Sequence, residues 1–145
     1  MADVTANILS ILAAALLGAV IGAEREWRRH PGGLRSCALV AAAAGVFAHI
    51  AVTHGGDSPG AALGAIATGV GFLGAGVILV RGVEVRGLTT AATFWAVAAI
   101  GTAAGLRDYG IALTLTVVVF FAHVALRPLS AWIERVAPPE DDGPH

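Results

Sequence analysis

Five long apolar segments dominate the chain. They lie at roughly 6–23, 36–53, 60–80, 88–106 and 109–126, and none of them contains an Asp, Glu, Lys or Arg residue. Each is close to the roughly 20 residues that a helix needs to cross the hydrocarbon core of a bilayer. Charged residues gather in the connections. The pattern predicts an all-α fold, an integral membrane bundle of five transmembrane helices.

The arginines between these segments predict the orientation of the bundle. Eight of them fall in alternate connections and after the fifth segment: Arg25, Arg28, Arg29, Arg35, Arg81, Arg86, Arg127 and Arg135. Arg107 alone lies on the opposite side. Since cytoplasmic connections carry the excess of basic residues, we expect the N-terminus outside and the C-terminus in the cytoplasm. No basic residue precedes the first segment, which favours a retained helix over a secretory signal.

Composition identifies the lipid bilayer as the main surroundings of the chain. Of the 145 residues, 57% are hydrophobic and 13% are charged, against about 25% charged in soluble domains. The formal net charge of −1 gives no electrostatic case for binding nucleic acid.

Two regions are expected on this basis. Residues 1–126 form the transmembrane domain, and residues 127–145 form a short amphipathic segment and then an acidic, Pro-rich cytoplasmic tail that is disordered. Trp132 and Ile133 in the amphipathic segment either lie at the membrane interface or continue the fifth helix.

Glycine pairs spaced four residues apart indicate close helix packing. They are Gly18 and Gly22, Gly60 and Gly64, and Gly101 and Gly105. Each pair places two glycines on one helix face, where another helix can approach the backbone. Such pairs serve either packing within one subunit or contacts between copies. The alternative that the protein forms a homo-oligomer is therefore kept.

The stretch 69–92 joins glycine-rich apolar sequence to a short charged break at 81–86. It predicts a helix, a charged loop and a second helix entered at Leu88. Thr89 or Thr90 is expected to cap that helix, because a hydroxyl oxygen accepts a bond from a free backbone N–H. The Gly33-Leu34 pair ends the first charged connection in the same way, which predicts a parallel repeat of helices one and two in helices three and four.

The connection after the first segment is the most densely charged part of the chain. Glu24 and Arg28 are four residues apart and are expected to pair on a helical extension. We predict a polar cytoplasmic cluster where the two charged connections meet. Its members are Glu24, Arg25, Arg28, Arg35, Arg81 and Arg86. The alternative is that these arginines only set the orientation of the helices.

The inventory of reactive residues argues against an enzyme. None of the serines lies in a nucleophile elbow, and Cys37 has no His near it in the sequence. Three glutamates are the only carboxylates on the predicted inner side before the tail, so no metal site and no cofactor is expected. His49 and His123 are each expected to bond to a neighbouring helix.

Four motifs, in this order, resemble the MgtC/SapB family of bacterial inner-membrane proteins. They are Gly22-Ala23-Glu24-Arg25-Glu26, Gly33-Leu34-Arg35-Ser36, Gly71-Phe72-Leu73-Gly74-Ala75-Gly76 and Gly87-Leu88-Thr89-Thr90-Ala91-Ala92, with Trp95 after the last. The match covers roughly residues 7–126. It implies a multi-pass unit of five helices in the bacterial inner (cytoplasmic) membrane, packed through the motif residues.

Better-known members of this family are linked to growth in low magnesium and to survival inside host cells. The resemblance implies a protein that modulates other membrane machinery, including the F-type ATP synthase, and does not itself carry Mg²⁺. Such members have a cytoplasmic ACT-like domain after the helices, whereas the part of this chain from Arg127 is too short for one. A regulatory role that depends on the ACT-like domain is therefore open to question for this chain.

We therefore expect an accessory or regulatory membrane protein of magnesium or ion homeostasis, acting through helix–helix contacts with partner complexes. The alternative is a small oligomeric ion transporter or channel, with Glu24, Arg25, Arg35 and Gly71–Gly76 around a pathway between subunits. The lack of carboxylates inside the apolar segments favours the accessory role.

Overall fold

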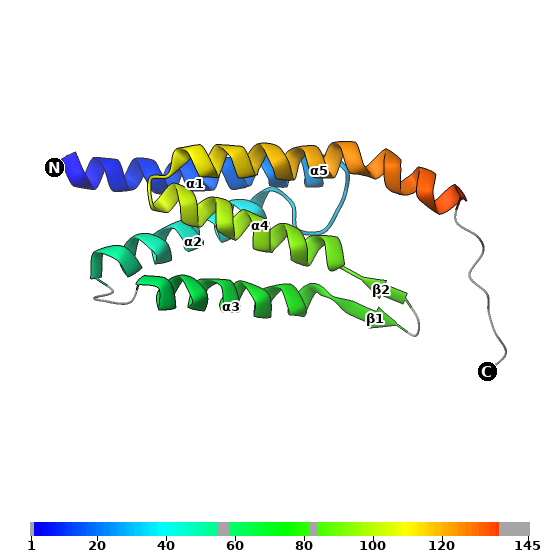
Figure 1. The fold of residues 1–145 in the computed structure, drawn as a ribbon, viewed down its shortest axis with the longest axis horizontal. Coiled ribbons are helices and arrows are strands. Elements are labelled where there is room, and N and C mark those ends of the chain that lie inside the picture. Colours follow the sequence, from blue (N-terminus) through cyan, green and yellow to red (C-terminus); the bar gives the residue numbers. More distant parts are fainter. Residues whose placement is uncertain (1, 55–58, 82–83, 137–145) are drawn as a thin grey trace.

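The computed structural model describes residues 2–54, 59–81 and 84–136, which form five helices and a two-stranded hairpin (Figure 1). The elements are α1 Ala2–Trp27, α2 Leu34–His54, α3 Pro59–Val77, β1 Leu79–Arg81, β2 Glu84–Arg86, α4 Leu88–Gly105 and α5 Tyr109–Val136. All five helices are long and apolar enough to cross a membrane. The predicted fold class, a bundle of five transmembrane helices, is confirmed.

Successive helices run in opposite directions along the bundle (Figure 1). The start of α1 and the turn between α4 and α5 lie at one end. The turn between α1 and α2, the β-hairpin and the end of α5 lie at the other. The two arginine-rich connections therefore share one end, and the assignment of that end to the cytoplasm stays a prediction.

Helix α4 occupies the centre of the bundle. It contacts α1, α2, α3 and α5, and half of its span is buried, whereas only 6% of the span of α3 is buried. Large apolar side chains cover the outside, with Leu16 67% and Phe72 84% exposed. Such a surface is expected where lipid rather than water surrounds the helices, because burial against another helix is then not needed to shield apolar groups.

Glycines allow α4 and α1 to approach α2 closely. A Cβ atom at Gly101 would overlap the backbone oxygen of Ala41, and one at Gly18 would lie 2.6 Å from the backbone oxygen of Cys37. Two of the predicted glycine pairs therefore pack within the subunit. The third pair differs, because a Cβ at Gly60 or Gly64 of α3 would meet no atom within 4 Å in the part of the chain that the structure describes.

The charged break in the stretch 69–92 is a β-hairpin and not an irregular loop. β1 and β2 pair antiparallel, with Val80 opposite Val85, so the third helix ends at Val77 and not at 80. The two connections at this end of the bundle thus differ in structure. The parallel repeat of helices one and two in helices three and four stays a prediction, which superposing residues 10–53 on 64–105 would test.

The expectation that Thr89 or Thr90 caps α4 is wrong. The capping residue is Gly87, which has a left-handed φ of 94° and makes no side-chain cap bond. Its carbonyl accepts a bond from the Ala91 N–H at 2.9 Å. The chain leaves the hairpin so sharply that a Cβ at Gly87 would overlap the backbone oxygen of Val77, which explains why glycine stands there.

Helix α5 continues without a break through Pro128 to Val136. The amphipathic segment with Trp132 and Ile133 is therefore a continuation of the fifth helix, and its depth in the membrane stays a prediction. The predicted disordered tail at 138–143 lies outside the described residues.

Candidate functional site

Arg25 is the centre of the polar end of the bundle. Its side chain, in the last turn of α1, is only 1% exposed. Nε and Nη2 donate to the backbone oxygens of Gly32 and Pro31 at 3.2 and 2.6 Å. Nη2 and Nη1 also donate to the hydroxyl oxygens of Thr90 and Thr93 at 2.8 and 3.0 Å. One guanidinium thus joins α1, the following turn and α4.

The turn after α1 is shaped to hold this guanidinium. Gly32 has a φ of 75°, a region that residues with a side chain rarely adopt. A Cβ there would lie 2.9 Å from the ring of Phe94, so the turn packs directly on α4. The carbonyls of the turn consequently face Arg25, where a charged donor compensates for the water they have lost.

Thr93 extends the network to α5. Its hydroxyl donates to the backbone oxygen of Thr89 at 2.7 Å and lies 3.0 Å from Nε2 of His123. A hydroxyl has a single proton, so with that proton given to Thr89 the histidine donates from Nε2. His123 therefore bonds to a neighbouring helix, as predicted. Its Nδ1 atom is buried and has no partner among the described residues.

Both glutamates of the charged connection have structural roles. Glu24 forms an ion pair with Arg28 one helical turn later, as predicted. Oε2 of Glu26 accepts a hydrogen bond from the Leu34 N–H at 2.8 Å. Glu26 thereby satisfies a free donor at the start of α2 from the end of α1, and its negative charge lies at the favourable pole of that helix.

A polar cavity of about 300 Å³ opens beside Arg25, between the ends of α1 and α5 and the start of α4. We call it the Arg25 pocket. It is lined by Glu24, Arg25, Arg28, His30, Thr89, Ala122, His123, Leu126, Arg127 and Ser130. Among the described side chains, the pocket contains three arginines and one carboxylate, so the charge of this set is positive. Within the described residues, no group of three His, Cys, Asp or Glu side chains is placed to hold a metal ion.

The structure brings together half of the predicted polar cluster. Glu24, Arg25 and Arg28 line the Arg25 pocket. Arg35 is exposed on α2, and Arg86 pairs with Glu84 within the hairpin at 2.7 Å. Neither of these two arginines is hydrogen-bonded to the first three in the described part of the chain. The side chain of Arg81 lies outside the described residues.

Sequence reasoning missed several residues of this site. Thr93, His30, Arg127 and Ser130 were not assigned to the cluster, although they bond to Arg25 or line its pocket. The available signal was the turn at 30–33, whose His-Pro-Gly-Gly sequence indicates a sharp bend after a charged helix end. Nothing in the local sequence shows which distant hydroxyl faces that bend.

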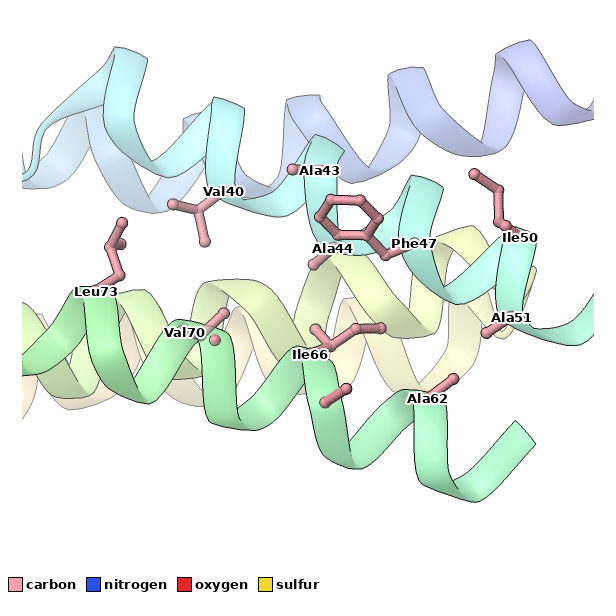
Figure 2. Close-up of a pocket in the computed structure, with 12 residues that line it drawn as sticks. Val40, Ala43, Ala44, Phe47, Ile50, Ala51, Ala62, Ile66, Val70 and Leu73 are labelled. Atoms are coloured by element: carbon pink, nitrogen blue, oxygen red, sulfur yellow. The ribbon is translucent and has the colours of Figure 1, made fainter. Parts of the chain in front are cut away.

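A second feature is a pair of apolar grooves along α3. The larger, of about 500 Å³, lies between α2 and α3, and Figure 2 shows Phe47, Ile66 and Val70 among its lining side chains. The smaller, of about 310 Å³, lies between α3 and α4 and is lined by Trp95 among others. We call them the α3 grooves. The described lining of the larger groove is apolar, and that of the smaller groove is apolar except for Thr102 and Asp108.

Replacing Thr93 with valine tests the polar network without changing its shape. The substitution should lower the free energy of unfolding by about 1–3 kcal/mol, because buried donors on Arg25 and His123 lose their acceptor. Thr89→Val is the matched control, since Thr89 is exposed and contributes only its backbone oxygen. Denaturant titration in mild detergent measures both. Equal stabilities for the two variants would contradict the network.

The helices and their hydropathy define a multi-pass membrane protein with a buried arginine at one end. The MgtC family model matches residues 11–132, and the chain belongs to the MgtC family. The resemblance read from its motifs is therefore confirmed.

Three relatives show how far the similarity extends. Protein MgtC of Salmonella typhimurium strain LT2 is 49% identical over 129 residues, which are 89% of this chain and 56% of the relative. An uncharacterized protein of Synechocystis is 42% identical over 130 residues, covering 89% and 56%. Protein MgtC of Brucella abortus strain 2308 is 42% identical over 120 residues, covering 82% and 50%. The chain thus spans about half the length of these relatives. No solved structure matches it significantly.

Proposed function

We propose that this chain is an accessory or regulatory protein of the bacterial inner membrane that serves magnesium or ion homeostasis. It acts through helix–helix contacts with a partner membrane complex. The observation that supports this most is α3, a membrane helix with open glycines and an apolar groove on either side.

Contacts within this subunit do not account for most of the glycines of α3. A Cβ at Gly64, Gly69, Gly71 or Gly76 would meet no atom of the described residues within 4 Å. Each glycine costs roughly 1 kcal/mol of helix stability relative to alanine. In a bilayer such positions let a second helix approach closely, and the α3 grooves offer apolar surface beside them. A helix of a partner complex, or of a second copy, suits this face.

Transport through a single copy has little support in the placement of polar groups. The hydroxyls of Ser10 and Thr116 donate to backbone oxygens of their own helix at 2.9 and 2.8 Å. Within the described residues, the five apolar spans contain no Asp, Glu, Lys or Arg between 6–23, 36–53, 60–77, 88–105 and 109–126, and the lining of the Arg25 pocket comes from one end of the bundle. An oligomeric transporter or channel, the alternative function, would need a pathway between copies.

The link to magnesium rests on the family. The better-known members that this chain resembles in its motifs are linked to growth in low magnesium. By that resemblance, growth in low magnesium is the phenotype to measure, and the F-type ATP synthase is a candidate partner. The partner is proposed here for the membrane domain alone, since the chain covers about half of its relatives.

Replacing Gly64 with leucine should abolish partner binding without unfolding the protein. The leucine side chain would start in open space on α3, because a Cβ at Gly64 meets no described atom within 4 Å, and there it would block a second helix. The readouts are co-purification of partner proteins in mild detergent and rescue of growth in low magnesium by the full chain. Val118→Leu, on the exposed face of α5, is the control and should behave like the unchanged protein.

Proteoliposomes that contain only this protein separate the two functions. The accessory role predicts no ion flux above that of empty vesicles. Saturable flux that Glu24→Gln abolishes would overturn the accessory role and support the oligomeric transporter. Retained partner binding by Gly64→Leu would remove α3 as the contact surface.

A further inference from the structure

We propose that the Arg25 pocket binds a phosphate group, carried either by an anionic phospholipid or by a free phosphate ion. The inference concerns the polar end of the bundle and does not depend on the contacts proposed for α3. It rests on the charge of the pocket, on the donors that face it and on its position at the helix ends.

The charge of the pocket is not balanced by its own residues. The one carboxylate among its described lining side chains, on Glu24, pairs with Arg28. All four hydrogen bonds of Arg25 end on neutral oxygens, namely two backbone carbonyls and two hydroxyls. Arg127 has no carboxylate partner among the described side chains. Two formal positive charges therefore remain, which repel a divalent cation and attract an anion.

The side chains around the cavity are donors of the kind that bind phosphate. The guanidinium of Arg127 matches two phosphate oxygens at once, as this planar group does in many phosphate sites. His30 adds an imidazole at the rim, and Ser130 adds a hydroxyl. Nδ1 of His123 does not belong to this set, because with the ring proton on Nε2 it is an acceptor and cannot donate to a phosphate oxygen.

The position of the pocket suits a lipid head group. It lies between transmembrane helices at the end of the bundle that carries the arginines, next to the apolar side chains of Ala122 and Leu126. Basic pockets in this position on the cytoplasmic side of other membrane proteins hold anionic head groups. The acyl chains of such a lipid would then lie along the exposed apolar face of α5.

The test is the thermal midpoint of the purified full chain in mild detergent, at constant ionic strength. The probes are short-chain phosphatidylglycerol, short-chain phosphatidylcholine and inorganic phosphate. A saturable rise with phosphatidylglycerol alone assigns the pocket to a lipid, and a saturable rise with inorganic phosphate assigns it to the free ion. No saturable rise with either, or an equal rise with the zwitterionic phosphatidylcholine, would overturn the proposal.

Variants locate the binding within the molecule. Arg127→Gln and His30→Gln change exposed side chains, so both variants should fold. Arg127→Gln should weaken the apparent affinity for the phosphate probe about tenfold, because a charged hydrogen bond is lost. Arg135→Gln removes the same charge from α5 beyond the pocket and should stay within about twofold, as exposed charges contribute little. Equal weakening by Arg127→Gln and Arg135→Gln would show diffuse surface attraction and refute the pocket.

Discussion

Replacing Arg25 with alanine should destabilise the folded bundle by about 3–5 kcal/mol, because buried acceptors left without a donor cost about 1–3 kcal/mol and truncation of a large buried side chain costs a few kcal/mol more. The loss has two sources. Four acceptors, two on the turn and two on α4, lose their charged donor at once. The substitution also leaves a cavity where a side chain that is 1% exposed had packed.

Two further variants make this prediction specific. Arg25→Lys keeps the charge but cannot reproduce the planar fork that reaches both the turn and α4, so its stability should be intermediate. Arg35→Ala removes an exposed arginine at the same end of the bundle and should change stability by at most about 0.5 kcal/mol. Unfolding by sodium dodecyl sulfate in mixed micelles measures all three. Similar losses for Arg25→Ala and Arg35→Ala would contradict the network.

Gly101→Ala should destabilise the bundle by about 1–3 kcal/mol, the usual cost of overpacking a close contact. The added methyl group would overlap the backbone oxygen of Ala41, which cannot move without displacing α2. Gly105→Ala should act in the same way, because a Cβ there would overlap the backbone oxygen of Gly45.

The same substitution in α3 should have the opposite sign. Gly64→Ala adds its methyl group in open space and gains up to about 1 kcal/mol of helix propensity in the isolated subunit. The unfolding titration described for Arg25 measures both changes. A loss of stability in Gly64→Ala equal to that in Gly101→Ala would contradict the open face of α3.

The sequence alone predicts the five spans, since a run of apolar residues near 20 in length has few other structures open to it. It also predicts the Glu24–Arg28 pair and the bond of His123 to another helix, which depend on local spacing or on a single polar group among apolar ones. The hairpin at β1 and β2 was not predicted, because three residues per strand are too few to show an alternating pattern.

The centre of the site was less accessible to sequence reasoning. The orientation rule explains eight arginines alike, so it cannot single out Arg25 as the buried one. Its side-chain partners Thr90 and Thr93 lie 65 and 68 residues further along the chain. Likewise, the pairs Gly60/Gly64 and Gly101/Gly105 are equivalent in spacing, and only the position of α4 at the centre of the bundle distinguishes them.

The separation between Arg25 and its partners has a consequence for how the chain assembles. The arginine emerges early in synthesis, and Thr90 follows 65 residues later. At roughly 5–20 residues per second, that interval lasts roughly 3–13 s. Throughout it, the guanidinium on α1 cannot make its bonds to α4, because α4 begins only at Leu88. These hydrogen bonds can form once α4 is present, so Arg25 stabilises the bundle only after the fourth helix has entered the membrane.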